Sequence, residues 1–135
     1  MSQYAKEEWK KIIAFTKWHQ SFSPYQVIAL ERTVTSAKYR FAGTFDALVY
    51  KAGKRYILDW KTSRTFQESF LLQLAAYATA AEEGGVAERI DGSAIVHLGT
   101  RHKEGFSFIE QDRKEIKKNF KLFLSAYAIA KTKEN

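Results

Sequence analysis

The chain has 135 residues, of which 45% are hydrophobic, 15% aromatic and 27% charged. This length matches one domain with one hydrophobic core, and the mixture of apolar and charged residues argues against both a disordered polymer and a membrane protein. The net charge of +7 favours a polyanionic partner, and the absence of cysteine excludes disulfides, thiol nucleophiles and cysteine-based zinc or iron–sulfur sites.

The chain shows no segment that directs it to a membrane. No apolar run approaches the roughly 18 residues that a membrane-spanning helix needs, and Met1 to Glu8 lacks the apolar segment of a secretory signal. No repeat, low-complexity tract or linker interrupts the sequence. We therefore expect a single domain over residues 1–135 that stays in the cytoplasm and has no membrane partner.

The first half of the chain reads as one helix followed by strands. Apolar residues alternate with lysines at helical spacing over Gln3 to His19, and Ser21 to Pro24 ends this helix. Residues that favour β-structure then dominate, with short turns between the runs. They predict an antiparallel meander of three strands, Tyr25 to Thr35, Tyr39 to Tyr50, and Arg55 to Trp60.

The second half predicts a helix, two strands and a helix. A run of good helix formers spans Gln67 to Glu83 and is followed by two glycines. Two short strands, Ser93 to Leu98 and Phe106 to Ile109, flank a loop, and Asp112 opens a final helix with an apolar stripe. The order α-β-β-β-α-β-β-α predicts a mixed sheet covered by helices, in an α/β or α+β domain.

The hairpin of the second and third predicted strands places two carboxylates together. A two-residue turn at Ala52 and Gly53 puts Asp46 directly opposite Asp59, and directly opposed residues share one face of a sheet. Lys61 joins the same face two residues beyond Asp59. A loop longer by one residue would send the two aspartates to opposite faces.

Two carboxylates about 5 Å apart repel each other by about 3 kcal/mol at an effective dielectric constant near 20. A divalent cation compensates this repulsion, and carboxylate oxygens are ligands that magnesium and manganese prefer. The alternative is that Asp46, Asp59 and Lys61 form a structural ion-pair cluster on an exposed sheet face.

Three short motifs resemble those of a known family. They are Gly43-Thr44-Phe45-Asp46 (G-x-x-D), Asp59-Trp60-Lys61 (D-x-K) and Gln73-Leu74-Ala75-Ala76-Tyr77 (Q-x-x-x-Y). Their order and spacing resemble the PD-(D/E)XK nuclease superfamily, and in particular its RecB-like branch, which includes many phage and prokaryotic exonucleases. The resemblance covers about Glu31 to Glu83 and implies a restriction-endonuclease-like core, with a central mixed sheet and a three-strand meander flanked by helices.

The resemblance also implies roles for these residues. Asp46 and Asp59 would bind Mg²⁺ or Mn²⁺, Trp60 would lend its backbone carbonyl, and Lys61 would orient the attacking water and steady the charge on the phosphate. On the helix that follows, a glutamine and a tyrosine four residues apart share one face. Of these, Gln73 would hold a water or a phosphate, and Tyr77 would stack on a base, donate to a phosphate or simply complete the core.

A third acid is expected beside the two aspartates. If the turn between the first two strands is centred between Lys38 and Tyr39, Glu31 lies level with Asp46, which makes Glu31 a candidate metal ligand. The alternative is a solvent-facing Glu31 that pairs with Arg32 or Lys38.

Polar residues in two predicted loops are candidates for contact with DNA. Thr62, Ser63 and Arg64 directly follow the D-x-K strand, and Arg101 and Lys103 lie in the loop between the last two strands. RecB-like nucleases often carry a histidine on a helix upstream of the first aspartate. In this chain the upstream candidate is His19, which lies closer to Asp46 in sequence than the resemblance would place it.

The leading hypothesis is a Mg²⁺- or Mn²⁺-dependent DNA nuclease, exonuclease-like, with DNA as its partner and with a second protein subunit or a homo-oligomer as further possibilities. The first alternative is a catalytically weak or inactive DNA-binding or scaffolding subunit that retains the nuclease fold. A second alternative, a carboxylate-based hydrolase for a small phosphorylated molecule, leaves the basic surface unexplained.

Overall fold

The computed structural model describes residues 2–99 and 102–134, with side chains described as far as residue 132. Its elements follow the order predicted from the sequence. They are α1 (Gln3–Phe22), β1 (Gln26–Ser36), β2 (Phe41–Lys51), β3 (Lys54–Lys61), α2 (Ser69–Glu83), β4 (Gly92–Leu98), β5 (Phe106–Asp112) and α3 (Arg113–Glu134).

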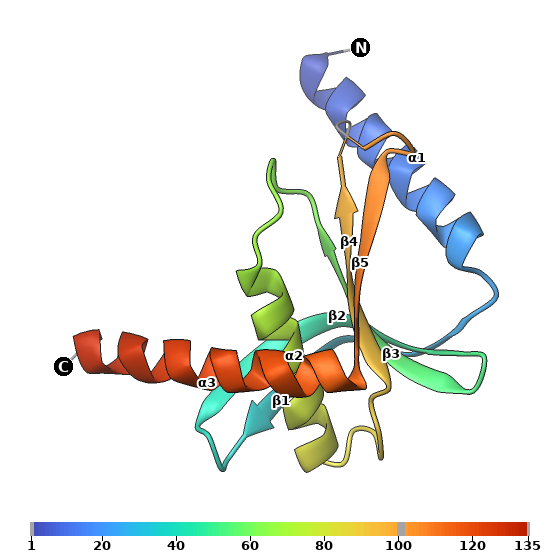
Figure 1. The fold of residues 1–135 in the computed structure, drawn as a ribbon. Coiled ribbons are helices and arrows are strands. Elements are labelled where there is room, and N and C mark those ends of the chain that lie inside the picture. The colour runs from blue at the N-terminus through green and yellow to red at the C-terminus, as the bar shows by residue number, and fades with distance from the viewer. Residues whose placement is uncertain (1, 100–101, 135) are drawn as a thin grey trace.

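The strands form one mixed sheet in the order β1-β2-β3-β4-β5. The β3–β4 pair is parallel, because α2 carries the chain back across the sheet, and the other pairs are antiparallel. Helix α1 covers one face, and α2 and α3 cover the other (Figure 1). The predicted antiparallel meander and the mixed sheet covered by helices are confirmed.

The hairpin of β2 and β3 has the predicted two-residue turn. Ala52 and Gly53 both have positive φ, at 50° and 81°, which matches the backbone twist of a tight hairpin turn. The register follows from this turn, and its last ladder pair is Ala47 opposite Leu58. Asp46 and Asp59 are the next residues along the two strands.

The alternation of side chains between the two faces breaks at Asp46. Phe45 and Leu48 belong to the core under α2, whereas Ala47 belongs to the core under α1. A regular strand would place residue 45 on the same side as residue 47. On the neighbouring strand, Glu31 lies level with Asp46, as predicted, and adopts a left-handed backbone with φ of 47°. Both strands therefore change face at this level.

Helix α1 contacts the sheet through one side, and many of its apolar residues lie elsewhere. Ala14 and Trp18 are buried in the core under α1, with exposed fractions of 5% and 0%. A Cβ placed on Gly105 would lie 3.3 Å from the Cβ of Ala14, so this helix approaches the β4–β5 turn closely. Other apolar residues of this helix are exposed, namely Trp9, Ile12, Ile13 and Phe15.

Helix α3 begins with reciprocal hydrogen bonds between Asp112 and Glu115. The Glu115 N–H donates to the Asp112 carboxylate at 2.8 Å, and the Asp112 N–H donates to the Glu115 carboxylate at 3.2 Å. Such a capping box satisfies backbone donors that a helix start leaves unpaired. Among the helices that the structure describes, none is long and apolar enough to cross a membrane.

Candidate active site

Backbone hydrogen bonds hold the side chains of Asp46 and Asp59 where the ladder between β2 and β3 ends. The Asp46 N–H donates to Asp59 Oδ1 at 2.8 Å, and the Trp60 N–H donates to Asp46 Oδ2 at 2.9 Å. The two carboxylates thus accept hydrogen bonds from the backbone of the opposite strand. The register deduced from the sequence therefore brings these two side chains together.

The pair has an unfavourable electrostatic environment. Asp59 is buried, with an exposed fraction of 6%, and Asp46 is half-buried. Burial and, next, the charge of Asp46 raise the pKa of the Asp59 carboxyl above its ordinary value. The hydrogen bond from the Asp46 N–H and the charge of Lys61 act in the opposite direction and only partly offset this rise.

Lys61 supplies the positive charge beside the pair. Its Nζ lies 3.3 Å from Asp59 Oδ2 and 5.1 Å from the centre of the Phe70 ring at the start of α2. The lysine side chain is 28% exposed. One side of the ammonium group is thus oriented by a carboxylate and a ring, and the group still reaches solvent.

Tyr77 packs directly on the backbone of β2. A Cβ placed on Gly43 would lie 2.0 Å from Cε1 of Tyr77, so only glycine leaves room for the ring. Burial and, next, the charge of Asp59 raise the pKa of the Tyr77 hydroxyl. The structure therefore brings Tyr77 of the third motif against Gly43 of the first.

Two other predicted residues lie apart from this group. Gln73 is exposed on α2, one turn before Tyr77, and forms no side-chain hydrogen bond with a described residue. Glu31 is exposed, and no group of three or more acidic or histidine side chains in the described ranges is placed to hold a metal ion. Glu31 does not join the two aspartates as the expected third acid, because its left-handed backbone interrupts the regular strand.

The two aspartates nevertheless match the donor chemistry of a hard divalent cation. One oxygen of each carboxylate accepts a backbone N–H, and the second oxygens are Asp46 Oδ1 and Asp59 Oδ2. Mg²⁺ is commonly held by one or two carboxylates, with water and substrate phosphate completing the shell. Burial and the charge of Asp46 disfavour the ionised form of Asp59. A bound cation would stabilise that ionised form.

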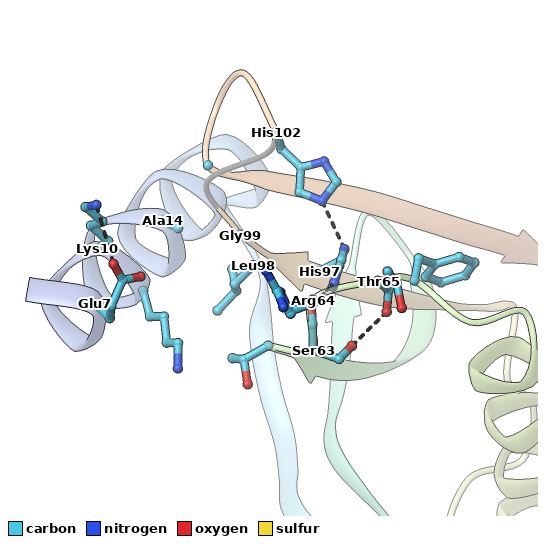
Figure 2. A pocket seen from close by; sticks show the side chains of 14 residues that line it. Glu7, Lys10, Ala14, Ser63, Arg64, Thr65, His97, Leu98, Gly99 and His102 are labelled. Carbon is cyan, nitrogen blue, oxygen red and sulfur yellow. Dashed lines mark hydrogen bonds and ion pairs between the residues drawn. The ribbon is translucent and has the colours of Figure 1, made fainter. Parts of the chain in front are cut away.

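A cavity of about 590 Å³ opens where β3 and β4 end. Figure 2 shows it between α1, the loop after β3 and the β4–β5 loop. Its lining includes Thr62, Ser63 and Arg64, the residues predicted to contact DNA, and the Arg64 side chain lies between the loop and α1. Lys10 lines the cavity from the side of α1, and its Nζ lies 3.6 Å from Glu7.

His97 ties this cavity together in a way that the sequence did not reveal. The His97 side chain is buried, with its Nε2 at 2.7 Å from the Ser63 carbonyl and its Nδ1 at 2.9 Å from Nε2 of His102. Because a carbonyl only accepts, Nε2 of His97 donates to Ser63, and in the neutral tautomer Nδ1 then accepts from His102. The position of His97 beside this loop follows from its parallel pairing with Lys61. A single sequence does not show such a pairing.

The remaining candidates lie elsewhere. His19 on α1 is exposed, and its Nδ1 lies 2.6 Å from the Tyr25 hydroxyl. Lys103 is exposed in the β4–β5 loop and does not line the cavity, and Arg101 lies outside the described residues. The side chain of Trp60 packs in the core under α1, while its N–H serves Asp46.

Comparisons with known proteins identify the family. A search of curated proteins found no match. Among solved structures, the chain is similar to the crystal structure of SSO0001, at 16% sequence identity and a TM-score of 0.41, over 76% of this chain and 48% of that chain. The chain thus spans about half the length of that protein.

A family model described as the PD-(D/E)XK nuclease superfamily matches residues 2–133, which is nearly the whole chain. The five-stranded mixed sheet flanked by helices agrees with the restriction-endonuclease-like fold of that superfamily. The chain belongs to the PD-(D/E)XK nuclease superfamily.

Proposed function

We propose that the protein is a divalent-metal-dependent DNA nuclease that hydrolyses phosphodiester bonds at Asp46, Asp59 and Lys61. The observation that supports this proposal is the pair of aspartates whose carboxylates each accept a backbone N–H of the opposite strand, with Asp59 buried and its pKa raised. A fold that only needed stability would gain from a neutral side chain at such a position. Membership of a nuclease superfamily supports the same conclusion.

In this proposal Asp46 and Asp59 hold Mg²⁺ or Mn²⁺, and the Trp60 carbonyl is a further ligand. When bound, the cation lowers the pKa of a water and neutralises charge on the phosphate. The backbone N–H donors orient the carboxylates, so that little reorganisation is needed on binding. Lys61 places an ammonium charge beside the attacked phosphate, where negative charge develops in the transition state.

The proposed DNA path continues from Lys61 into the cavity at the ends of β3 and β4. Thr62, Ser63 and Arg64 would contact the sugar–phosphate backbone there, with the Ser63 carbonyl fixed by His97. Tyr77 would face the substrate from α2, and Gln73 one turn earlier would contact a phosphate or a water. The three motifs also support the finer proposal of a RecB-like, exonuclease-like enzyme of DNA processing, repair or phage DNA metabolism.

The test is a cleavage assay with labelled single- and double-stranded DNA in Mg²⁺, Mn²⁺ or a chelator. We expect cleavage that needs the metal and falls by at least about 10²-fold in both Asp59→Ala and Lys61→Ala. Glu88→Ala is a matched control because Glu88 is an exposed acid outside the proposed site, and it should cleave normally. Cleavage that survives Asp59→Ala would overturn the site.

A second candidate function is a DNA-binding subunit that retains the fold without turnover. The exposed, separate position of Glu31 favours it, because the aspartate pair then has no third acid among the described residues. DNA binding without cleavage in either metal, unchanged in Asp59→Asn, is the result expected of this alternative.

A further inference from the structure

A second cavity, of about 490 Å³, lies between α2 and α3. It shares no lining residue with the cavity at the ends of β3 and β4, and neither Asp46 nor Asp59 borders it. Its lining combines apolar and aromatic side chains with three basic ones. The lining residues are Tyr39, Ala78, Thr79, Glu82, Arg113, Ile116, Lys117, Phe120, Lys121 and Leu124.

The charge around this cavity is strongly positive. From Arg113 to Thr132, α3 has six basic side chains and one acidic side chain, in a chain whose net charge is +7. The acid that lines the cavity, Glu82, is already paired, because its carboxylate accepts two hydrogen bonds from the Arg113 guanidinium. Lys117 and Lys121 are exposed and form no ion pair with a described carboxylate.

Aromatic rings border the same space. Tyr39 and Phe120 line the cavity and meet edge to face, with their centres 5.1 Å apart. Both side chains are half-buried. Lys38 lies 5.2 Å from the centre of the Tyr39 ring and adds a cation beside it. Aromatic rings beside unpaired lysines match a ligand that has flat uncharged faces joined by anionic groups.

We propose that this cavity binds single-stranded nucleic acid. An unpaired base stacks on the ring of Tyr39, and the flanking phosphates contact Lys117 and Lys121. A base held in a duplex stack does not present its face to a cavity, so the arrangement selects a single strand. Binding at this site requires no cleavage and no metal, and it therefore stands or falls independently of the proposed nuclease activity.

The first test is fluorescence anisotropy with a labelled oligothymidine, without metal and with chelator. We expect the double variant Lys117→Glu/Lys121→Glu to bind about tenfold more weakly or worse. The matched control is Lys114→Glu/Lys118→Glu, which makes the same charge change on exposed residues of the same helix that do not line the cavity. An equal loss in the control would show attraction to the helix charge alone and would overturn the proposal.

The second test removes the stacking contribution. Tyr39→Leu keeps an apolar contact with Phe120 but has no ring, and we expect it to weaken binding about fivefold or more. An oligonucleotide with abasic residues should show a similar loss on the wild-type protein and little further loss on Tyr39→Leu. Abasic and intact oligonucleotides that bind equally tightly would contradict stacking in this cavity. Circular dichroism of each variant checks that it is folded.

Three further ligands define the class of partner. Oligothymidine and oligouridine distinguish the two sources of a single strand, and the proposal expects at least one of them to bind in a way that depends on Lys117 and Lys121. A duplex of the same length should bind more weakly than the single strand, and its binding should depend less on Lys117 and Lys121. If oligoglutamate displaces the labelled oligonucleotide as well as an unlabelled oligonucleotide does, the surface is a site for acidic proteins, and the proposal is wrong.

The results also separate this site from the active site. A protein that never cleaves DNA but shows these variant effects would retain the inference and lose the proposed nuclease function. A protein that cleaves DNA but binds single strands equally well in every variant would retain the function and lose the inference.

Discussion

The ring of Tyr77 lies on the backbone of Gly43, at a position where any β-carbon would overlap it. The overlap would be severe, because a β-carbon would lie 2.0 Å from Cε1 and 2.4 Å from Cζ of the ring. This contact joins α2 to β2 three residues before Asp46, and the charge of Asp59 contributes to the raised pKa of the same tyrosine. The glycine of the first motif and the tyrosine of the third are therefore one structural unit.

Gly43→Ala should destabilise the protein by about 1–3 kcal/mol, because the added methyl group overpacks a rigid ring. Gly43 has no positive φ, so the effect is steric rather than conformational. Urea unfolding of Gly43→Ala, Tyr77→Ala and the double variant measures the coupling. We expect the double variant to be more stable than the sum of the single effects predicts. Additive effects would show that the two residues are independent.

Asp59→Asn should stabilise the metal-free protein while abolishing cleavage. The amide oxygen still accepts the Asp46 N–H, and the buried charge and its repulsion with Asp46 disappear. The melting temperature in chelator should rise, at roughly 3–5 °C per kcal/mol for a chain of this size.

The matched control for that variant is Asp91→Asn. Burial raises the pKa of Asp91, but the hydrogen bonds from the Arg55 N–H and from Arg89, with the charge of Arg89, lower it overall. The charge of Asp91 therefore favours the folded state, and Asp91→Asn should lower the melting temperature. A lower melting temperature for both variants would contradict the conclusion that the buried charge of Asp59 destabilises the metal-free protein.

Metal binding should depend on pH through Asp59. A raised pKa in the folded state means that the free protein is most stable when Asp59 is protonated, and that this contribution is lost as the pH rises through the folded-state pKa. A cation needs the ionised form, so Mn²⁺ affinity should rise over the same pH range.

Lys61→Ala removes a charge that lowers the pKa of Asp59, so the midpoint of Mn²⁺ binding should move to higher pH. Isothermal titration calorimetry with Mn²⁺ at several pH values measures this midpoint. Lys103→Ala, an exposed lysine outside the aspartate group, should leave it unchanged. A midpoint that is the same in wild type and Lys61→Ala would contradict the pairing of Lys61 with Asp59.

Acid should loosen the cavity at the ends of β3 and β4. Burial and, next, the charge of His97 lower the pKa of His102 below its ordinary value of 6.5. The folded state therefore favours neutral His102, and its contribution to stability is lost as the pH falls below the ordinary value. His102→Gln should show a smaller drop in melting temperature between about pH 7.5 and pH 5.5 than wild type. An unchanged drop would exclude this role of the histidine pair.

Much of the aspartate pair could be predicted because its geometry is local. The two-residue turn at Ala52 and Gly53 determines which residues of β2 and β3 face each other, and strand parity then brings Asp46 to Asp59. The position of Glu31 level with Asp46 likewise followed from the turn between β1 and β2. Its left-handed backbone did not, because no glycine or asparagine marks that position.

The sequence did not show which side of α1 packs on the sheet. Helical periodicity shows that apolar residues are spaced for burial, but not which of them meet the sheet. Small Ala14 allows the helix to approach Gly105, and Trp18 fills the core, whereas Ile12 and Trp9 remain exposed. Packing density at the contact, rather than hydrophobicity alone, selects the buried side.

The sequence by itself determined the order of the elements, the register of the β2–β3 hairpin and the residues of the three motifs. These depend on turn chemistry and side-chain periodicity over short stretches of chain. Only the tertiary structure decided that Tyr77 packs on Gly43, that His97 holds the Ser63 carbonyl, and that α2 and α3 enclose a basic cavity. Each of these contacts joins distant segments across the parallel crossover or between helices, and short-range patterns do not specify such pairings.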